Sequence, residues 1–266
     1  MSQLPDYIQK NKASWNQKTE HHFNSDFYDV DSFLKGKNSL NEIELKLLGN
    51  IRGKDVLHLQ CHFGMDSISM ARMGATVTGI DLSDKAIGKA NELVKQTGTN
   101  ASFICCDVYE VSEYLNKKFD IVFSSYGTIG WLPDLGKWAA LIADRLKKGG
   151  KFVFAEFHPF IWMFDNDFEK IQYKYERSEP IIETETGTYA DRSASITTET
   201  VSWNHSISEV LNNLVVHGLE INIFNEYDYS PYNCFNKTEE FEPGKFRIKH
   251  LGNKVPMVYA LVATMK

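Results

Sequence analysis

Residues 55–81 contain an apolar run, a loop, an amphipathic segment and a second apolar run that ends in Asp81. The alternation continues with apolar segments at 101–106, 120–124 and 151–157. Apolar strands that alternate with amphipathic helices are typical of a doubly wound α/β sheet, whose mostly parallel strands are covered on both faces. The sequence therefore predicts a Rossmann-like nucleotide-binding sheet over residues 55–157.

Helix signals support this order of elements. Residues 39–48 carry Leu and Ile at helical spacing, with Asn38 or Ser39 as the expected N-cap. Ser83 and Asp134 are expected to cap two further helices, because short polar side chains bond the free N–H groups of a first turn.

The alternation stops after residue 158. The aromatic and Thr-rich residues 160–204 predict an antiparallel β insertion, with strands at 171–175, 181–186 and 196–203. A helix beginning at Ser206 or Ser208 and strands at 219–227 and 255–264 should follow. The long polar connection 228–254 is expected to serve a binding site, since structureless loops of that length are uncommon.

Residues 1–38 form an N-terminal helical extension before the main domain of residues 39–266. Its scattered aromatic residues either cover an edge of the core or act as a lid, with Trp15 and Tyr28 closing over a ligand. The insertion 160–204 is expected to cap the site of the same domain at which a substrate would bind.

Composition limits the partners. The net charge of −6 and the lack of a Lys/Arg block argue against nucleic acid and favour a small molecule. The first ten residues lack the features of a secretory signal, and no apolar run approaches the roughly 20 residues that span a bilayer. We therefore expect a soluble, cytoplasmic protein without membrane attachment, as a monomer or a homodimer.

The four cysteines, Cys61, Cys105, Cys106 and Cys234, contain no CxxC pair, so structural thiols are expected. No metal site is predicted, because Cys61 and His62 are neighbours on a loop and no second ligand pair is evident.

Several segments together resemble the class I S-adenosylmethionine-dependent methyltransferases. The resemblance covers residues 40–157 and, in pattern only, residues 205–264. The segments that carry it are Val56-Leu57-His58-Leu59-Gln60-Cys61-His62-Phe63-Gly64, Gly79-Ile80-Asp81-Leu82-Ser83, Cys106-Asp107-Val108, Phe119-Asp120-Ile121-Val122-Phe123 and Leu146-Lys147-Lys148-Gly149-Gly150-Lys151. The resemblance implies a seven-stranded sheet with an antiparallel last strand.

The first loop departs from the usual amino-acid sequence of that family. Where three glycines follow an acidic residue, this chain has His58, then Gln60, His62 and Gly64. The Leu-Gln-Cys-His-Phe-Gly motif of this chain is similar to that of a subgroup of bacterial members. Glycine lets a loop take positive φ, so Gln60 and His62 are expected to fit without that freedom or to reach the ligand with their side chains.

The resemblance implies S-adenosylmethionine as cofactor and S-adenosylhomocysteine as product. In that arrangement Asp81 would accept the ribose hydroxyls, Asp107 and Val108 would meet the adenine, and Ser124 and Tyr126 would line the methionine end. The complete set of expected cofactor residues is Gln60, Cys61, His62, Gly64, Asp81, Leu82, Asp107, Val108, Ser124 and Tyr126.

Methyl transfer needs two aligned reactants and, for a hydroxyl or ammonium acceptor, a group that takes a proton. His158 is the expected base, because it follows the strand at 151–157 at the edge where ligands bind in such sheets. The residues expected around the acceptor are Trp15, Tyr28, Trp131, His158 and His205.

These observations predict a methyltransferase that acts on a small-molecule acceptor. Two alternatives remain open from the sequence. A non-catalytic protein that binds the cofactor or a metabolite would explain the altered glycine loop, and a nicotinamide-dependent oxidoreductase would share the opening βαβ unit.

Overall fold

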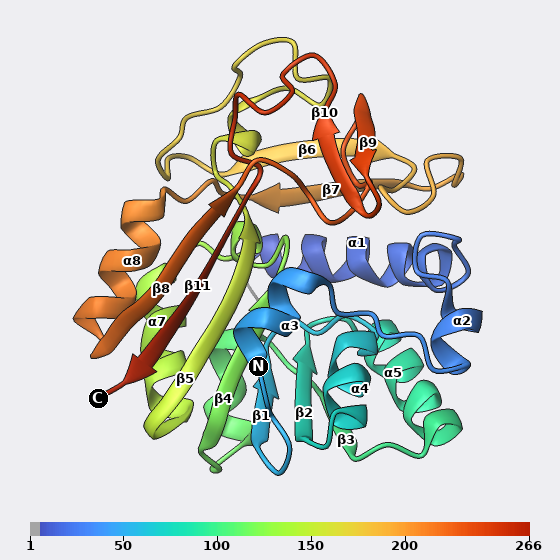
Figure 1. Cartoon of the computed structure of the whole chain (residues 1–266). Coiled ribbons are helices and arrows are strands. Elements are labelled where there is room, and N and C mark those ends of the chain that lie inside the picture. The colour runs from blue at the N-terminus through green and yellow to red at the C-terminus, as the bar shows by residue number, and fades with distance from the viewer. Residues whose placement is uncertain (1–5) are drawn as a thin grey trace.

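The computed structural model describes residues 6–266. Its centre is a seven-stranded sheet in the order β3-β2-β1-β4-β5-β11-β8 (Figure 1). The strands are β1 Asp55–His58, β2 Thr76–Asp81, β3 Ala101–Cys105, β4 Phe119–Ser125, β5 Leu146–Phe157, β8 Leu219–Tyr227 and β11 Val258–Met265. The strands from β3 to β5 pair in parallel, whereas β11 runs antiparallel to both β5 and β8. The predicted doubly wound sheet with an antiparallel last strand is confirmed.

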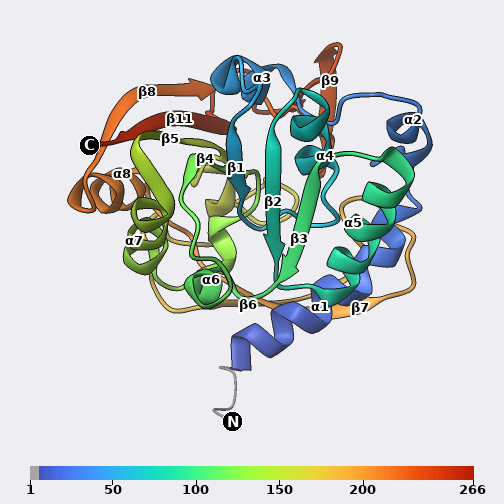
Figure 2. The same cartoon turned by 90° about the horizontal axis from the view of Figure 1, so that it is seen from below.

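Helices cover both faces of the sheet (Figure 2). The main-domain helices are α3 Glu42–Leu48, α4 Met65–Arg72, α5 Asp84–Thr97, α6 Val111–Tyr114, α7 Leu135–Arg145 and α8 Ile207–Val216. In β5, Phe152 and Phe154 pack on the side of α7 and α8, and the alternate residues Val153 and Ala155 pack on the side of α3. This two-sided burial explains why the parallel strands read as continuous apolar runs.

The remaining elements lie beyond the carboxyl ends of the parallel strands (Figure 1). They are the helices α1 Asp6–Phe23 and α2 Val30–Leu34, the hairpin of β6 Ile181–Thr186 with β7 Thr197–Ser202, and the hairpin of β9 Thr238–Glu242 with β10 Lys245–Ile248. Short 3₁₀ turns occupy Val108–Glu110, Ile129–Trp131 and Ile161–Met163. Residues 1–5 of the predicted extension lie outside the described residues.

Several boundaries differ from the sequence expectations. Helix α3 begins at Glu42 with Asn41 as its N-cap, because Asn41 and Glu44 form a capping box that neither Asn38 nor Ser39 can form. The predicted strand at 171–175 is wrong, since the N–H groups of Gln172 and Tyr173 both donate to the Met163 carbonyl instead of a ladder.

Two further expectations concern the second half of the chain. The connection 228–254 is not a simple loop, because its middle folds into the β9–β10 hairpin. Ser206, not Ser208, caps α8, and its Oγ accepts the N–H of Glu209.

Among the described residues, no helix is both long and apolar enough to cross a lipid bilayer.

Candidate functional site

A cavity of about 990 Å³ lies over the carboxyl ends of the parallel strands. Its walls come from the loops after β1, β2, β3 and β4, from α1, from the β6–β7 hairpin and from residues 231–236. From β1 the strands are added toward one edge as β2 and β3, and then toward the other edge as β4 and β5. The strand order therefore reverses between β1 and β4, the position at which ligands bind in open α/β sheets. The side chain of Gln60 spans the point of reversal, since its Nε2 donates to the Thr128 carbonyl at 2.8 Å.

The loop after β1 keeps the backbone shape of a glycine loop without two of the glycines. Gln60 and His62 have φ of 52° and 51°, and Gly64 has φ of 76°. Gln60 and His62 thus take the left-handed conformation of the missing glycines although they lack the conformational freedom of glycine. Each such residue costs about 1–2 kcal/mol, which the surrounding contacts must offset. Gly64 is fixed by packing as well, because a Cβ there would lie 2.4 Å from Phe103.

Asp81 closes this loop from the end of β2. Its Oδ2 accepts the His62 N–H at 2.8 Å and its Oδ1 accepts the Ser83 N–H at 2.8 Å. Desolvation raises the pKa of Asp81 to about 6, although the backbone N–H donors favour its charged form. Each carboxylate oxygen keeps a second lone pair, so the group can accept two hydroxyl protons from a ligand in the cavity.

Asp107 stands at the end of the neighbouring strand β3. Its Oδ1 accepts the Tyr109 N–H at 2.9 Å, and desolvation raises its pKa. Asp107, Leu82 and Val108 all line the cavity. Two carboxylates at adjacent strand ends, with apolar neighbours between them, form a slot that suits a nucleoside.

Unpartnered polar atoms lie in the same place. Within residues 6–266, Gln60 Oε1 and His62 Nδ1 are buried and have no hydrogen-bond partner. Buried polar groups of native proteins nearly always have one, so a polar ligand is expected to complete this loop. The residues present therefore fit a nucleoside cofactor.

Of the other expected cofactor residues, Cys61 and Tyr126 line the cavity and Ser124 does not. Cys61 is buried and lines the cavity, and all four cysteines are free thiols. Tyr126 also lines it, with φ of 45° and its hydroxyl donating to Glu44 Oε2 at 3.0 Å. Ser124 does not line it, because its buried hydroxyl turns to Thr128 Oγ1 at 3.1 Å.

Sequence reasoning missed Glu156, which organises the loop after β4. Its buried carboxylate accepts the N–H groups of Gly127, Thr128 at 2.8 Å and Ile129 at 3.3 Å, as well as the Thr128 hydroxyl at 3.0 Å. It also accepts its neighbour Phe157 N–H at 2.7 Å. The signal was present in the sequence, since Glu156 is the charged residue of an otherwise apolar run at 152–157.

The expected lid residues Trp15 and Tyr28 line the cavity. The Trp15 ring meets the edges of Trp131 and His62, with centroid distances of 5.5 and 5.3 Å. The Tyr28 hydroxyl lies 2.6 Å from that of Tyr189 in the insertion. Trp15 and Tyr28 of the extension and Tyr189 of the insertion all line the cavity, so the extension and the insertion share one wall of it.

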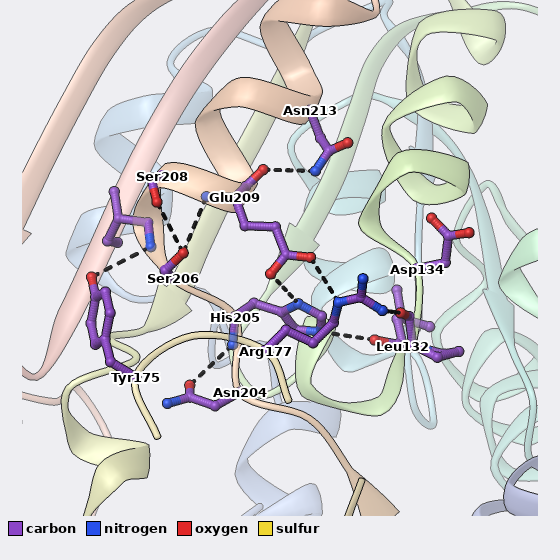
Figure 3. A network of polar contacts seen from close by, with 12 residues as sticks. Leu132, Asp134, Tyr175, Arg177, Asn204, His205, Ser206, Ser208, Glu209 and Asn213 are labelled. Atoms are coloured by element: carbon purple, nitrogen blue, oxygen red, sulfur yellow. Dashed lines mark hydrogen bonds and ion pairs between the residues drawn. The ribbon is translucent and has the colours of Figure 1, made fainter. Parts of the chain in front are cut away.

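His205 lines the cavity, but both of its ring nitrogens are engaged elsewhere (Figure 3). Nδ1 lies 3.0 Å from Glu209 Oε2, and Nε2 donates to the Leu132 carbonyl at 2.8 Å. Arg177 reaches the other oxygen of Glu209 at 3.3 Å and the carbonyl of Pro133 at 2.7 Å. This network joins α8, the insertion and the loop before α7.

His158 is buried and does not line the cavity. Its Nδ1 accepts the Phe160 N–H at 3.1 Å, so Nε2 carries the proton and meets Glu226 Oε1 at 2.9 Å. Neither nitrogen has a lone pair free to accept a proton from an acceptor in the cavity. Among residues 6–266, no group of three His, Cys, Asp or Glu side chains could hold a metal ion.

Comparison with known proteins agrees with this geometry. Residues 56–150 match the family model for the methyltransferase domain. A ubiquinone biosynthesis O-methyltransferase of Aromatoleum aromaticum is 31% identical over 132 residues, which are 48% of this chain and 56% of that protein. One from Idiomarina loihiensis is 28% identical over 135 residues, 49% of this chain and 55% of that protein. The chain thus spans about half the length of these curated relatives.

Solved structures share the architecture. An S-adenosylmethionine-dependent methyltransferase from Mesorhizobium loti has a TM-score of 0.57 and 19% identity, covering 87% of this chain and 99% of that one. Magnesium protoporphyrin IX methyltransferase from Synechocystis, with bound S-adenosylmethionine, has a TM-score of 0.57 and 14% identity over 100% of both chains. At these identities the likeness shows the fold. Residues 56–150 match the methyltransferase-domain model, and the seven-stranded order of the sheet agrees with the fold of these solved S-adenosylmethionine-dependent methyltransferases.

Proposed function

We propose that the protein transfers a methyl group from S-adenosylmethionine to a hydroxyl oxygen of a small aromatic acceptor. The observation that carries the proposal is one continuous cavity with two kinds of wall. Its floor holds the loop of residues 60–64 with Asp81 and Asp107, and aromatic side chains line much of the rest. A donor and an acceptor held together in such a cavity react without a covalent enzyme intermediate.

In this proposal the floor holds the cofactor. Asp81 accepts the ribose hydroxyls, and Asp107 with the backbone of Val108 meets the adenine. Gln60 and His62 supply the buried polar atoms that lack a protein partner. The cofactor contributes an electrophilic methyl group on a positively charged sulfur, and nearby ring faces such as that of Trp131 would stabilise the positive charge.

The class of acceptor rests on two observations. Aromatic rings stack with aromatic rings in offset or edge-to-face geometry. The aromatic residues that line the cavity include Tyr7, Trp15, Tyr28, Trp131, Tyr189 and Trp203. The curated relatives matched over the cofactor-binding half carry names of O-methyltransferases, which favours oxygen over nitrogen or sulfur as the methylated atom.

Calorimetry with S-adenosylhomocysteine tests the cofactor half of the proposal. The wild type should bind, and Asp81→Ala should bind at least about tenfold more weakly, the effect of losing one charge-assisted hydrogen bond. Asp31→Ala is the matched control, because Asp31 is exposed on α2 and does not line the cavity. No binding by the wild type would refute the cofactor assignment.

Transfer of a labelled methyl group tests the acceptor half. Phenols and catechols should be methylated in preference to aliphatic amines and thiols. Binding of S-adenosylhomocysteine without transfer to any acceptor, including those of a cell extract, would instead favour a non-catalytic binding protein.

A further inference from the structure

Lys18 on α1 is a buried lysine whose amine forms no ion pair among the described residues. Its side chain lines the cavity, and the residue is only 5% exposed. Within the described part of the chain, its Nζ makes no hydrogen bond or ion pair, and its nearest characterised contact is the Trp15 ring at 5.5 Å. Burying an ammonium group without a partner is unfavourable, and the cost is removed when the group becomes neutral.

The groups that face Lys18 come from the β6–β7 hairpin and from its own helix. Glu183 and Glu185 are its carboxylate neighbours, and His22 lies close enough to interact with it electrostatically. Neither carboxylate bonds to the amine: Glu183 accepts the Tyr173 hydroxyl at 2.7 Å, and Glu185 accepts from Asn166 Nδ2 at 3.5 Å.

Burial makes the neutral amine of Lys18 easier to form than that of an exposed lysine. Desolvation lowers the pKa of Lys18, and the more distant charges of Glu185 and Glu183 offset the shift only in part. A neutral lysine has a lone pair that can accept a proton. The same two carboxylates and the Trp15 ring would then stabilise the ammonium group once it forms.

The histidines in and near the cavity are not free to take the acceptor proton. His58 lines the cavity, but its Nδ1 lies 2.8 Å from Ser67 Oγ and burial lowers its pKa to about 3. His158 and His205 use both ring nitrogens in contacts with protein groups. His62 shares a hydrogen bond of 3.0 Å with His22, and burial lowers the pKa of His62 to about 3 and that of His22 to about 2. The neutral amine of a lysine is a base strong enough to take the proton of a phenolic hydroxyl, whose pKa is about 10.

On the basis of the proposed function, we propose that Lys18 is the general base that takes the proton from the acceptor hydroxyl during methyl transfer. The O–H proton passes to the Lys18 amine while the acceptor oxygen forms its bond to the methyl carbon. The electron pair of the broken carbon–sulfur bond stays on the sulfur. The ammonium of Lys18 then releases the proton to water when the cavity opens.

A different role is possible for a buried lysine that lines a pocket, namely binding an anionic group of the acceptor. The two glutamates argue against it, because they would repel a second anion beside Lys18. Arginine separates the two roles experimentally. It keeps the positive charge but cannot accept a proton at neutral pH.

The first test requires no acceptor. In protein labelled with ¹³C at lysine Cε, the resonance that disappears in Lys18→Arg should titrate below the ordinary lysine pKa of 10.5, with and without S-adenosylhomocysteine. Titration at or above that value would overturn the proposal. Because this readout is independent of turnover, it remains informative even if methyl transfer is not found.

The second test uses the best hydroxyl acceptor of the panel described above. Lys18→Arg and Lys18→Met should both lower kcat by about 10²-fold or more, the usual contribution of a general base, while S-adenosylhomocysteine affinity changes less than threefold. Lys12→Met is the control on the same helix, since Lys12 pairs with Asp84 and does not line the cavity. Retained activity in Lys18→Arg would overturn the base role in favour of anion binding. Failure of the wild type to bind S-adenosylhomocysteine would instead refute the proposed function.

Discussion

Glycine at position 60 or 62 is expected to give a more stable protein than alanine at the same position. Both residues hold left-handed backbone, with φ of 52° and 51°. Alanine keeps the Cβ that clashes in this conformation, whereas glycine removes it. Since neither has a polar side chain, the difference between the two variants isolates the backbone.

The expected size follows from two opposing effects. A Cβ in the left-handed region costs about 1–2 kcal/mol, and glycine loses about 0.5–1 kcal/mol more backbone entropy on folding. Glycine should therefore exceed alanine by about 0.5–1 kcal/mol at each position. Relative to wild type, Gln60→Gly also loses the 2.8 Å bond to the Thr128 carbonyl, worth about 0.5–1.5 kcal/mol, so it should lie close to the wild type.

Urea unfolding followed by tryptophan fluorescence and circular dichroism measures the difference. Asn91 supplies the matched control, because it is exposed within α5, where alanine should be about 1 kcal/mol more stable than glycine. The sign of the difference should thus reverse between Asn91 and the two loop positions. Alanine equal to or more stable than glycine at positions 60 and 62 would refute a strained loop.

Three further expectations concern buried carboxyl groups. Desolvation and nearby Asp66 raise the pKa of Glu44 from 4.5 to about 7. The stability that protonated Glu44 contributes is therefore complete below about pH 4.5 and is lost as pH rises through 7. Glu44→Gln should then be more stable than wild type at pH 8, by up to about 3 kcal/mol in urea unfolding, and an unchanged pH profile would contradict this. Glu156→Gln places an amide donor against the N–H groups of residues 127–129. It should lower the free energy of unfolding by about 3 kcal/mol or more in the same assay. A decrease below about 1 kcal/mol would show that the carboxylate is not needed. If Asp81 must be ionised to bind the ribose, S-adenosylhomocysteine affinity should fall about tenfold between pH 7 and pH 5, since its pKa is about 6, and Asp81→Asn should abolish that dependence in calorimetry.

The central sheet was predictable because its signals are local. Ser83 and Asp134 cap α5 and α7 as expected, and the apolar runs became β1 to β5 with ends shifted by a few residues. The number of strands and the antiparallel β11 came from the resemblance rather than from any one segment.

The parts that sequence reasoning missed depend on contacts between distant residues. His158 looked like a free base, but Glu226, 68 positions later, occupies its Nε2. The N–H donors that Glu156 accepts lie 27 to 29 positions earlier. The burial of Lys18 results from a hairpin more than 150 residues further along the chain, and no local pattern around Lys18 indicates it.

The contact between Asn11 and Val201 has a consequence for measuring how the cavity opens. The Asn11 amide imitates a strand, because Nδ2 donates to the Val201 carbonyl at 2.8 Å and Oδ1 accepts the Val201 N–H at 2.9 Å. This pairing covers the edge of β7 that a neighbouring chain could otherwise extend. The Val201 amide proton can exchange with solvent only when α1 separates from the hairpin. Its exchange rate therefore counts the openings of the cavity directly, in protein that carries no label and no ligand.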